Sequence, residues 1–260
     1  MARLGYERYQ RELEAEAARF VEVTRGADPT VPVPTCPEWT LPTLTEHLGR
    51  AHRWAATIVS RRGKSLVRFR DTPDRDLPDG AEAREAWLLA GASRLVEAVR
   101  EAGPSLPVWS WAGEQTAGFW VRRMAHETVM HRADAEITVG RTVQIAADMA
   151  ADGVSEWLEI IPYALDDADL AALADLPGHG ESLHFHATDD GLGEAGEWLV
   201  RLTPSGVVWQ PGHGKGDGAV RAAAAELLLL LLRRIPSDDP RIEVLGNPKL
   251  LDHWLEHTRF

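Results

Sequence analysis

Two polar residues one helical turn apart are the first candidates for chemistry in this sequence. Glu127 and His131 are four residues apart in a segment with helical periodicity, which brings their side chains to one face with Cβ atoms about 5–6 Å apart. Met124, Thr128 and Ala135 flank the pair and place it on or beside the buried stripe. A carboxylate and an imidazole on a buried face are costly unless they are paired or bind a metal ion.

A second helical segment supplies a third candidate ligand. His47 lies in the apolar stripe of the segment 41–58. An α-helix turns by about 100° per residue, which rotates His52 by about 140° from His47. The same angle separates His126 from His131. Periodicity therefore favours His47 and His131 as ligands and places the other two histidines on the flanks of their helices.

Two histidines and one glutamate form an open ligand set, which leaves positions on a metal ion for water or substrate. Zinc suits these ligands, and nickel, iron and cobalt also accept imidazole and carboxylate. The sequence therefore predicts one divalent metal ion, expected to be zinc, held by His47, Glu127 and His131. The alternative is an ordinary helical pair of Glu127 and His131, which is the more frequent reason for such a spacing when it is taken alone.

Helices carry these residues in the first half of the chain. Apolar residues recur there at a helical period, and the segments that they predict as helices are 4–21, 41–58, 87–98 and 117–139. The proline-rich segment 28–34 separates the first two, because proline cannot donate the backbone hydrogen bond that a helix needs. A further helix is expected at about 145–160.

Alternating patterns replace helical ones in the second half. Residues 182–187 and 197–202 alternate as half-buried strands do. A turn at 203–206 then leads to a hairpin partner at 207–209. The remaining predicted elements are a helix at 219–234, a strand at 241–245 and a helix at 249–257.

These patterns predict an α+β protein with two domains. Residues 1–145 are expected to form a four-helix bundle, and residues 146–260 a linker helix and an α+β domain with an antiparallel sheet. The length of 260 residues suits two domains of ordinary size. Nothing in the sequence specifies the oligomeric state, and a monomer or a homodimer is expected.

Charge and hydropathy argue against nucleic acid and membrane partners. The formal net charge is −12, and so acidic a surface repels nucleic acid and anionic lipid. The apolar run 227–232 is far shorter than the roughly 20 residues of a membrane span. No secretory or transit pattern opens the sequence. We therefore expect a cytoplasmic protein with small-molecule partners, no nucleic acid partner and no membrane partner.

The sequence has a single cysteine, Cys36, so it forms no intrachain disulfide and no cysteine-based metal site. Cys36 is expected to be a small buried hydrophobic residue. Any thiol chemistry would therefore use a thiol supplied from outside the protein.

Several segments resemble the mycothiol-dependent maleylpyruvate isomerase family. In the first half these are Cys36-Pro-Glu-Trp39, Leu44-Thr-Glu-His47-Leu48, and the segment from Phe119 to Asp134, which holds Glu127-Thr-Val-Met-His131. In the second half they are 183–189, 196–201 and the leucine-rich segment that ends at Arg233-Arg234. The resemblance implies a DinB-like four-helix bundle followed by a sterol-carrier-protein-like domain.

The resemblance also implies site residues and a cosubstrate. The family's metal is bound by one histidine and a Glu-x-x-x-His pair, which match His47, Glu127 and His131. Its active site includes an arginine of the C-terminal domain, which matches Arg234 or its neighbour Arg233. Mycothiol is the implied thiol. Two adjacent arginines near the end of a helix can instead complement its dipole.

The expected function is therefore that of a metal-dependent enzyme in which a small thiol attacks an electrophilic molecule, giving thiol transfer or isomerisation. One alternative is a hydrolase in which the metal activates water. The other is a non-catalytic protein that binds a small molecule and uses the metal only for structure.

Other polar residues are assigned lesser roles. His184 and His186 alternate on one strand face, a spacing that can bind metal, but a solvent-facing or domain-interface role is favoured. His213 lies in a glycine-rich segment that lacks the phosphate-loop pattern. Asp134 is either a surface residue or a carboxylate that orients the second ring nitrogen of His131.

Overall fold

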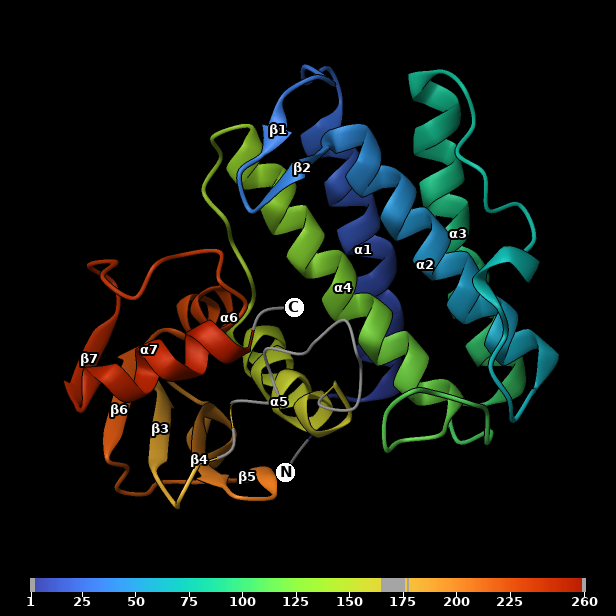
Figure 1. Cartoon of the computed structure of the whole chain (residues 1–260). Coiled ribbons are helices and arrows are strands. Elements are labelled where there is room, and N and C mark those ends of the chain that lie inside the picture. Colours follow the sequence, from blue (N-terminus) through green and yellow to red (C-terminus); the bar gives the residue numbers. More distant parts are fainter. Residues whose placement is uncertain (1–2, 165–175, 177, 259–260) are drawn as a thin grey trace. The chain divides into compact units, whose positions relative to one another are not determined.

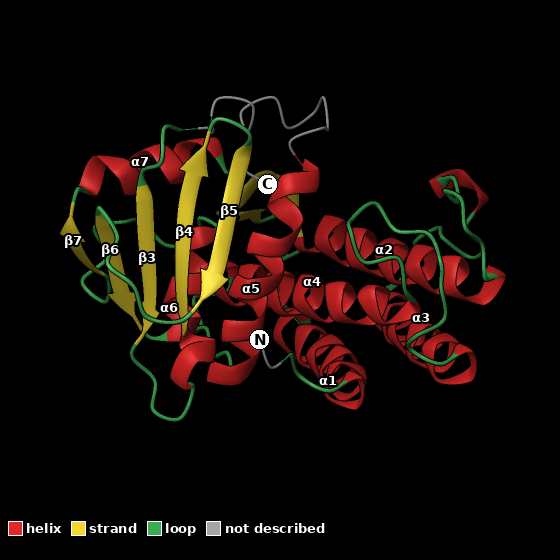
Figure 2. Cartoon of the chain, turned by 90° about the horizontal axis from the view of Figure 1, so that it is seen from below, coloured by secondary structure: helices red, strands yellow, loops and turns green. Residues whose placement is uncertain are grey.

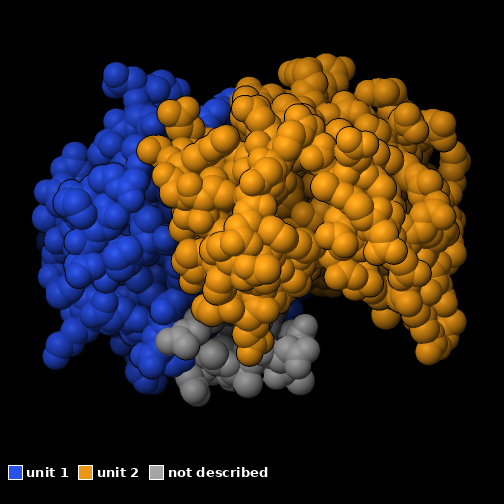
Figure 3. Space-filling view, turned by 90° about the horizontal axis from the view of Figure 1, so that it is seen from above, with its two compact units in different colours: residues 1–4, 145–260 blue, residues 5–144 orange. Residues whose placement is uncertain are grey.

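The computed structural model describes residues 3–164, 176 and 178–258. They fall into two compact units, which Figure 3 distinguishes by colour. One, the helical unit, comprises residues 5–144. The other, the mixed unit, comprises residues 1–4 and 145–260. That the segments 1–145 and 146–260 fold as independent domains stays a prediction.

The helical unit is a four-helix bundle, as predicted. Helix α2 packs against α3 and α4, and α1 packs against the same two helices (Figure 1). A short antiparallel hairpin and one 3-10 turn lie in the connections. The elements are α1 (Tyr6–Thr24), β1 (Pro32–Val33), β2 (Cys36–Thr40), α2 (Leu41–Arg61), η1 (Phe69–Asp71), α3 (Ala81–Ala102) and α4 (Ala117–Thr138).

Helix α4 is buried around nearly its whole circumference. The side chain of Thr116 caps its start by accepting a hydrogen bond from the Phe119 amide, and Gly140 follows its end at a φ of 72°. Polar groups on so buried a helix need partners, because an unpaired buried charge is costly. Arg132 accordingly pairs with Glu16 of α1 and with Glu136, and also donates to the Gln144 carbonyl.

The proline-rich segment forms the hairpin that precedes α2. Val33 pairs with Cys36 across the turn and is fully buried. Helix α2 then begins at Leu41, with Pro42 in its first turn, where the missing amide hydrogen costs nothing. The hairpin therefore ends with Trp39 directly before the helix that carries His47.

A close approach of two helices fixes the position of α2. A Cβ atom on Gly49 would lie 1.9 Å from the Trp87 ring of α3. The Trp87 indole is itself held by a hydrogen bond to the Asp74 carbonyl and by the Arg53 guanidinium, which lies 4.0 Å from the ring centroid. Only glycine fits at this position, so the contact sets the distance between α2 and α3.

The mixed unit contains a five-stranded sheet in the order β5-β4-β3-β6-β7 (Figure 2). Neighbouring strands are antiparallel, as predicted, except that β3 and β6 run parallel. The elements are α5 (Ala147–Ala164), β3 (Ser182–Ala187), η3 (Gly193–Gly196), β4 (Glu197–Thr203), β5 (Gly206–Pro211), β6 (Gly218–Ala222), α6 (Ala224–Leu231), β7 (Glu243–Gly246) and α7 (Pro248–His257).

Helices cover one face of this sheet. Phe185 and Trp198 are paired across β3 and β4 and point to that face. The Trp198 indole donates to Ser155 of α5 at 2.9 Å, and the Phe185 ring lies 6.0 Å from that of Trp254 in α7. Side chains alternate across a strand, so His184 points to the opposite face of the sheet.

The predicted helix at 219–234 is wrong over its first part. Residues 218–222 form β6, and the helix α6 covers only Ala224–Leu231. Alanine favours helix locally, but β6 pairs with β3 and β7 on its two sides. This pairing overrides the local preference, and Val220 and Ala222 are buried on the core side.

Among the described residues, no helix is both long enough and apolar enough to cross a membrane.

Candidate metal centre

The helical unit brings the three predicted ligands together. His47 comes from α2, and Glu127 and His131 come from α4. Oε1 of Glu127 lies 2.8 Å from Nε2 of His47 and 3.3 Å from Nε2 of His131. The two imidazole rings are 4.9 Å apart and nearly perpendicular, at 79°. One ligand atom from each of the three residues can be chosen so that all lie within 4.8 Å of one another.

Charged neighbours keep the Glu127 carboxylate ionised. Burial alone would raise the pKa of Glu127, but the Arg123 guanidinium and the two histidines hold it well below its usual range. Arg123 lies one turn earlier on α4 and contacts Oε2, the oxygen that faces away from His47. A carboxylate that is ionised before a cation arrives needs no deprotonation to bind it.

A chain of hydrogen bonds orients His131. Nδ1 of the ring lies 2.8 Å from Oδ2 of Asp134, which is fully buried, and Thr35 donates to the other Asp134 oxygen at 2.6 Å. Burial alone would lower the pKa of His131, but its bonds to Asp134 and Glu127 raise it to about 9. Carboxylates bound to the second ring nitrogen are typical of histidines that ligate metal.

The site is closed on one side and open on the other. The indole of Trp39 lies 4.9 Å from the His47 ring and 5.9 Å from the His131 ring, between centroids. The side chain of His47 is 37% exposed, against 10% for that of His131. A small molecule can therefore approach from the His47 side.

The two histidines that periodicity did not favour, His52 and His126, lie outside this group. His52 is fully buried, not on an exposed flank, and its Nε2 bonds to Thr128 of α4 at 2.8 Å. Burial lowers the pKa of His52 to about 3, so the ring is neutral. His126 is also buried, and its ring lies 6.1 Å from that of Tyr9 in α1. Rotation around each helix separates both residues from the three candidate ligands.

The donor set of the site fits a divalent metal ion. Two imidazoles and one ionised carboxylate converge, one imidazole is already oriented by an outer carboxylate, and one side is open. This is the chemistry of a catalytic metal site with three protein ligands. The ligands alone do not select zinc over cobalt, nickel or iron.

The predicted catalytic arginine lies in the mixed unit, just after α6. Arg234 is half-buried, and its guanidinium donates to the Leu232 carbonyl at 2.6 Å. Arg233 has a positive φ of 63° and donates to the Leu255 carbonyl. Arg233 thus contacts α7, and the catalytic role of Arg234 stays a prediction.

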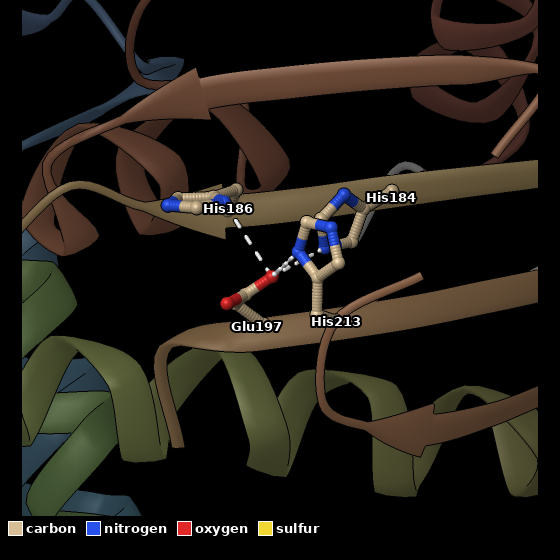
Figure 4. A group of neighbouring side chains, drawn as sticks. All are labelled: His184, His186, Glu197 and His213. Carbon is tan, nitrogen blue, oxygen red and sulfur yellow. Dashed lines mark hydrogen bonds and ion pairs between the residues drawn. The ribbon is translucent and has the colours of Figure 1, made fainter. Parts of the chain in front are cut away.

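The structure also shows a cluster that the sequence interpretation missed. His184, His186, Glu197 and His213 gather on the uncovered face of the sheet (Figure 4). His184 is 5% exposed, so of the two roles predicted for it the solvent-facing one is wrong, and the domain-interface role stays a prediction. The pairing of His186 with Glu197 across β3 and β4 was the available signal. The position of His213 above them depends on a loop that periodicity does not describe.

Comparisons with known proteins agree with this architecture. Residues 10–136 match the family described as mycothiol maleylpyruvate isomerase N-terminal domain, and residues 148–253 match the MDMPI C-terminal domain. No curated protein matches the chain.

Two solved structures share the fold. They are crystal structures of the mycothiol-dependent maleylpyruvate isomerase, with a TM-score of 0.59, and of a mutant of it, with a TM-score of 0.60. Each is 14% identical to this chain, and each match covers 94% of this chain and 95% of the other. At this identity the likeness shows the fold.

Proposed function

We propose that this chain, which belongs to the mycothiol-dependent maleylpyruvate isomerase family, is a metal-dependent enzyme that uses mycothiol to isomerise a small electrophilic molecule. The proposed dependence on a metal ion rests on one observation. His47, Glu127 and His131 converge on one point, and Asp134 orients the last of them.

Each residue of the centre has a defined task in this proposal. A divalent ion held by the three ligands would lower the pKa of a bound thiol and keep its sulfur as a thiolate at neutral pH. Arg123 fixes Glu127 by contacting its outer oxygen, and Asp134 fixes the tautomer of His131. The Trp39 indole lies beside both imidazoles.

Isomerisation requires that the thiol be returned unchanged. The thiolate adds to one carbon of an activated carbon–carbon double bond, and the electron pair of the broken π bond moves onto the conjugated carbonyl. After rotation about the resulting single bond, this electron pair returns and expels the thiolate, which restores the double bond in the new geometry. Arg234 is the proposed catalytic residue of the mixed unit, because a guanidinium stays charged and matches a substrate carboxylate in shape. Retention of the sulfur on the product would instead indicate thiol transfer.

Turnover should require added mycothiol both in the wild type and in Cys36→Ala, because the chain has no other cysteine to serve as the nucleophile. Cys36 is half-buried beside the core cluster that includes Leu44 and Leu48. We expect Cys36→Ala to retain turnover within a few-fold, apart from a packing loss of about 1 kcal/mol. Steady-state rates on maleylpyruvate with and without mycothiol measure this. Thiol-independent turnover that disappears in Cys36→Ala would refute the external nucleophile.

Asp134→Asn should weaken zinc binding by about 10–100-fold, as loss of an outer-shell carboxylate does. The change keeps the size of the side chain but removes the charge that holds Nδ1 of His131. Competition with a chromophoric chelator measures the affinity in chains that also carry His213→Ala, which disrupts the histidine cluster of the mixed unit. Thr138→Ser is a matched control, because its hydroxyl bonds to the Asp134 backbone carbonyl and not to the carboxylate that contacts His131. Equal zinc affinity in Asp134→Asn and the control would exclude an orienting role for the carboxylate.

Zinc uptake at this centre should release one proton near neutral pH. Although burial opposes protonation, Asp134 and Glu127 raise the pKa of His131 to about 9, so the metal-free ring is protonated there. Zinc must displace that proton, and its apparent affinity therefore falls as the pH drops below about 9. Calorimetry of a chain carrying His213→Ala, which disrupts the histidine cluster of the mixed unit, counts the protons in two buffers of different ionisation enthalpy. Uptake without proton release would contradict this assignment.

A further inference from the structure

The mixed unit holds a second group of metal-binding side chains, separate from the centre of the helical unit. Nε2 of His184 and Nδ1 of His213 lie 2.9 and 2.7 Å from Oε2 of Glu197, and Nδ1 of His186 lies 3.4 Å from it. Figure 4 shows the three rings surrounding this one oxygen. One ligand atom of each residue lies within 4.8 Å of the others.

The rings are arranged as ligands around a common point. The planes of His184 and His213 meet at 87°, those of His186 and His213 at 90°, and those of His184 and His186 at 76°. A carboxylate oxygen has about two acceptor sites, so three ring N–H groups cannot all be well satisfied by Oε2 of Glu197. A cation among the four groups would instead use one lone pair from each.

Backbone bonds on both sides hold the loop that brings His213 to this place. The amide of Gly212 donates to the Glu197 carbonyl at 2.9 Å. At the other end, Asp217 donates to the Ser182 carbonyl and accepts from the Ser182 amide and hydroxyl. The loop therefore runs along the antiparallel pair of β3 and β4, from the first residue of β4 to the first residue of β3.

Glycine is required for this close approach. A Cβ atom on Gly216 would lie 2.6 Å from the Gly218 carbonyl oxygen and 2.9 Å from the amide nitrogen of His184. One on Gly214 would lie 2.9 Å from the side chain of Leu199. The glycine-rich sequence thus permits contact between the loop and the sheet, and it needs no phosphate ligand to explain it.

Burial and charge suit a cation at this cluster. The side chain of His184 is 7% exposed and that of Glu197 is 18% exposed, whereas that of His213 is 77% exposed. Arg221, in register with His186 on β6, is paired with Glu243 at 3.1 Å.

We propose that His184, His186, Glu197 and His213 form a second metal site, which takes a divalent first-row transition ion such as zinc and fastens the loop 212–217 to the sheet. Imidazole ligands favour such ions over calcium and magnesium, which prefer oxygen. Four protein ligands fill a tetrahedral shell and leave no position for substrate, so the site is structural. This inference does not depend on the proposed function.

Zinc binding to full-length, untagged protein tests the site. Metal-free His131→Ala, in which the centre of the helical unit is disabled, should bind about one zinc ion per chain. His131→Ala/His213→Ala should bind zinc at least about tenfold more weakly, since a ligand matters at least as much as an outer-shell partner. His131→Ala/His179→Ala is the matched control, because His179 is an exposed histidine outside the cluster. Equal zinc affinity in all three proteins would overturn the proposal.

A protease specific for lysine reports on the loop itself. The chain has three lysines, Lys64, Lys215 and Lys249, and Lys215 is an exposed residue of the loop. Zinc should slow cleavage after Lys215 at least fivefold in His131→Ala but not in the double variant with His213→Ala, and calcium should not slow it. Cleavage after Lys64 provides the internal reference. Equal slowing by zinc with and without His213 would show that the loop is not bound through this residue.

Discussion

His131→Ala is expected to lose the metal ion of the helical unit and, with it, thiol-dependent turnover. His131 supplies one of three ligand groups and is the one that Asp134 orients. A catalytic metal ion stabilises the transition state by several kcal/mol. A change of about 1.4 kcal/mol in the activation free energy corresponds to a factor of ten in rate. We therefore expect turnover to fall by about a thousandfold or more. Steady-state kinetics with mycothiol and maleylpyruvate measure this loss.

Metal content must fall together with turnover. Elemental analysis is made in chains that already carry His213→Ala, so that the second cluster does not contribute. There, His131→Ala should lower the metal content by about one equivalent per chain. Glu127→Gln, which is nearly the same size, should do the same, whereas His126→Ala should keep the metal. Equal metal content in the His131→Ala chain and its parent would show that His131 is not a metal ligand.

Arg132→Ala should destabilise the protein more than any surface change. Arg132 is 1% exposed, and its guanidinium contacts Glu16 of α1 and Glu136 of α4. Its removal takes from Glu16, itself 3% exposed, a buried cationic partner, whereas Arg19, with which this carboxylate also pairs, is exposed. Breaking a buried ion pair in this way costs about 3–5 kcal/mol. Urea unfolding of the metal-free protein measures the loss.

A double variant identifies the cause of that loss. If the cost comes from the stranded carboxylate, Arg132→Ala/Glu16→Gln should recover part of the stability that Arg132→Ala loses. Arg25→Ala, which removes an exposed pair with Glu85, should change stability little. A double variant less stable than Arg132→Ala would show that packing, not charge, sets the cost.

Periodicity was enough to predict most of the long helices, the strands of the hairpin 197–209 and the group of candidate ligands. The strand 182–187 was predicted with the bounds that β3 has. His47 and His131 were chosen over His52 and His126 by helical rotation, and the structure brings the chosen pair to Glu127. Both predictions depend on the spacing of residues within a single helix or strand, and this spacing can be read directly from the sequence. That these residues bind metal stays a prediction.

The features that were missed depend on contacts between distant segments. His184 was assigned to a polar face, and that face is the uncovered one, but the loop carrying His213 folds back over it. The segment 219–222 was assigned to a helix because alanine favours one locally, whereas pairing with β3 makes it a strand. Neither the loop position nor the strand pairing is encoded in a periodic pattern.

Titration of cobalt-loaded protein with mycothiol tests whether the thiol binds a metal ion held by His47, Glu127 and His131. A chain carrying His213→Ala is used, so that the cobalt spectrum reports only on His47, Glu127 and His131. A sulfur ligand changes the coordination of cobalt. We expect mycothiol to shift the cobalt absorption bands, and the shift to saturate at one equivalent of mycothiol per chain. His131→Ala should abolish the shift. An unchanged spectrum at saturating mycothiol, with cobalt demonstrably bound, would contradict thiol activation at this centre and favour a hydrolytic or purely binding role.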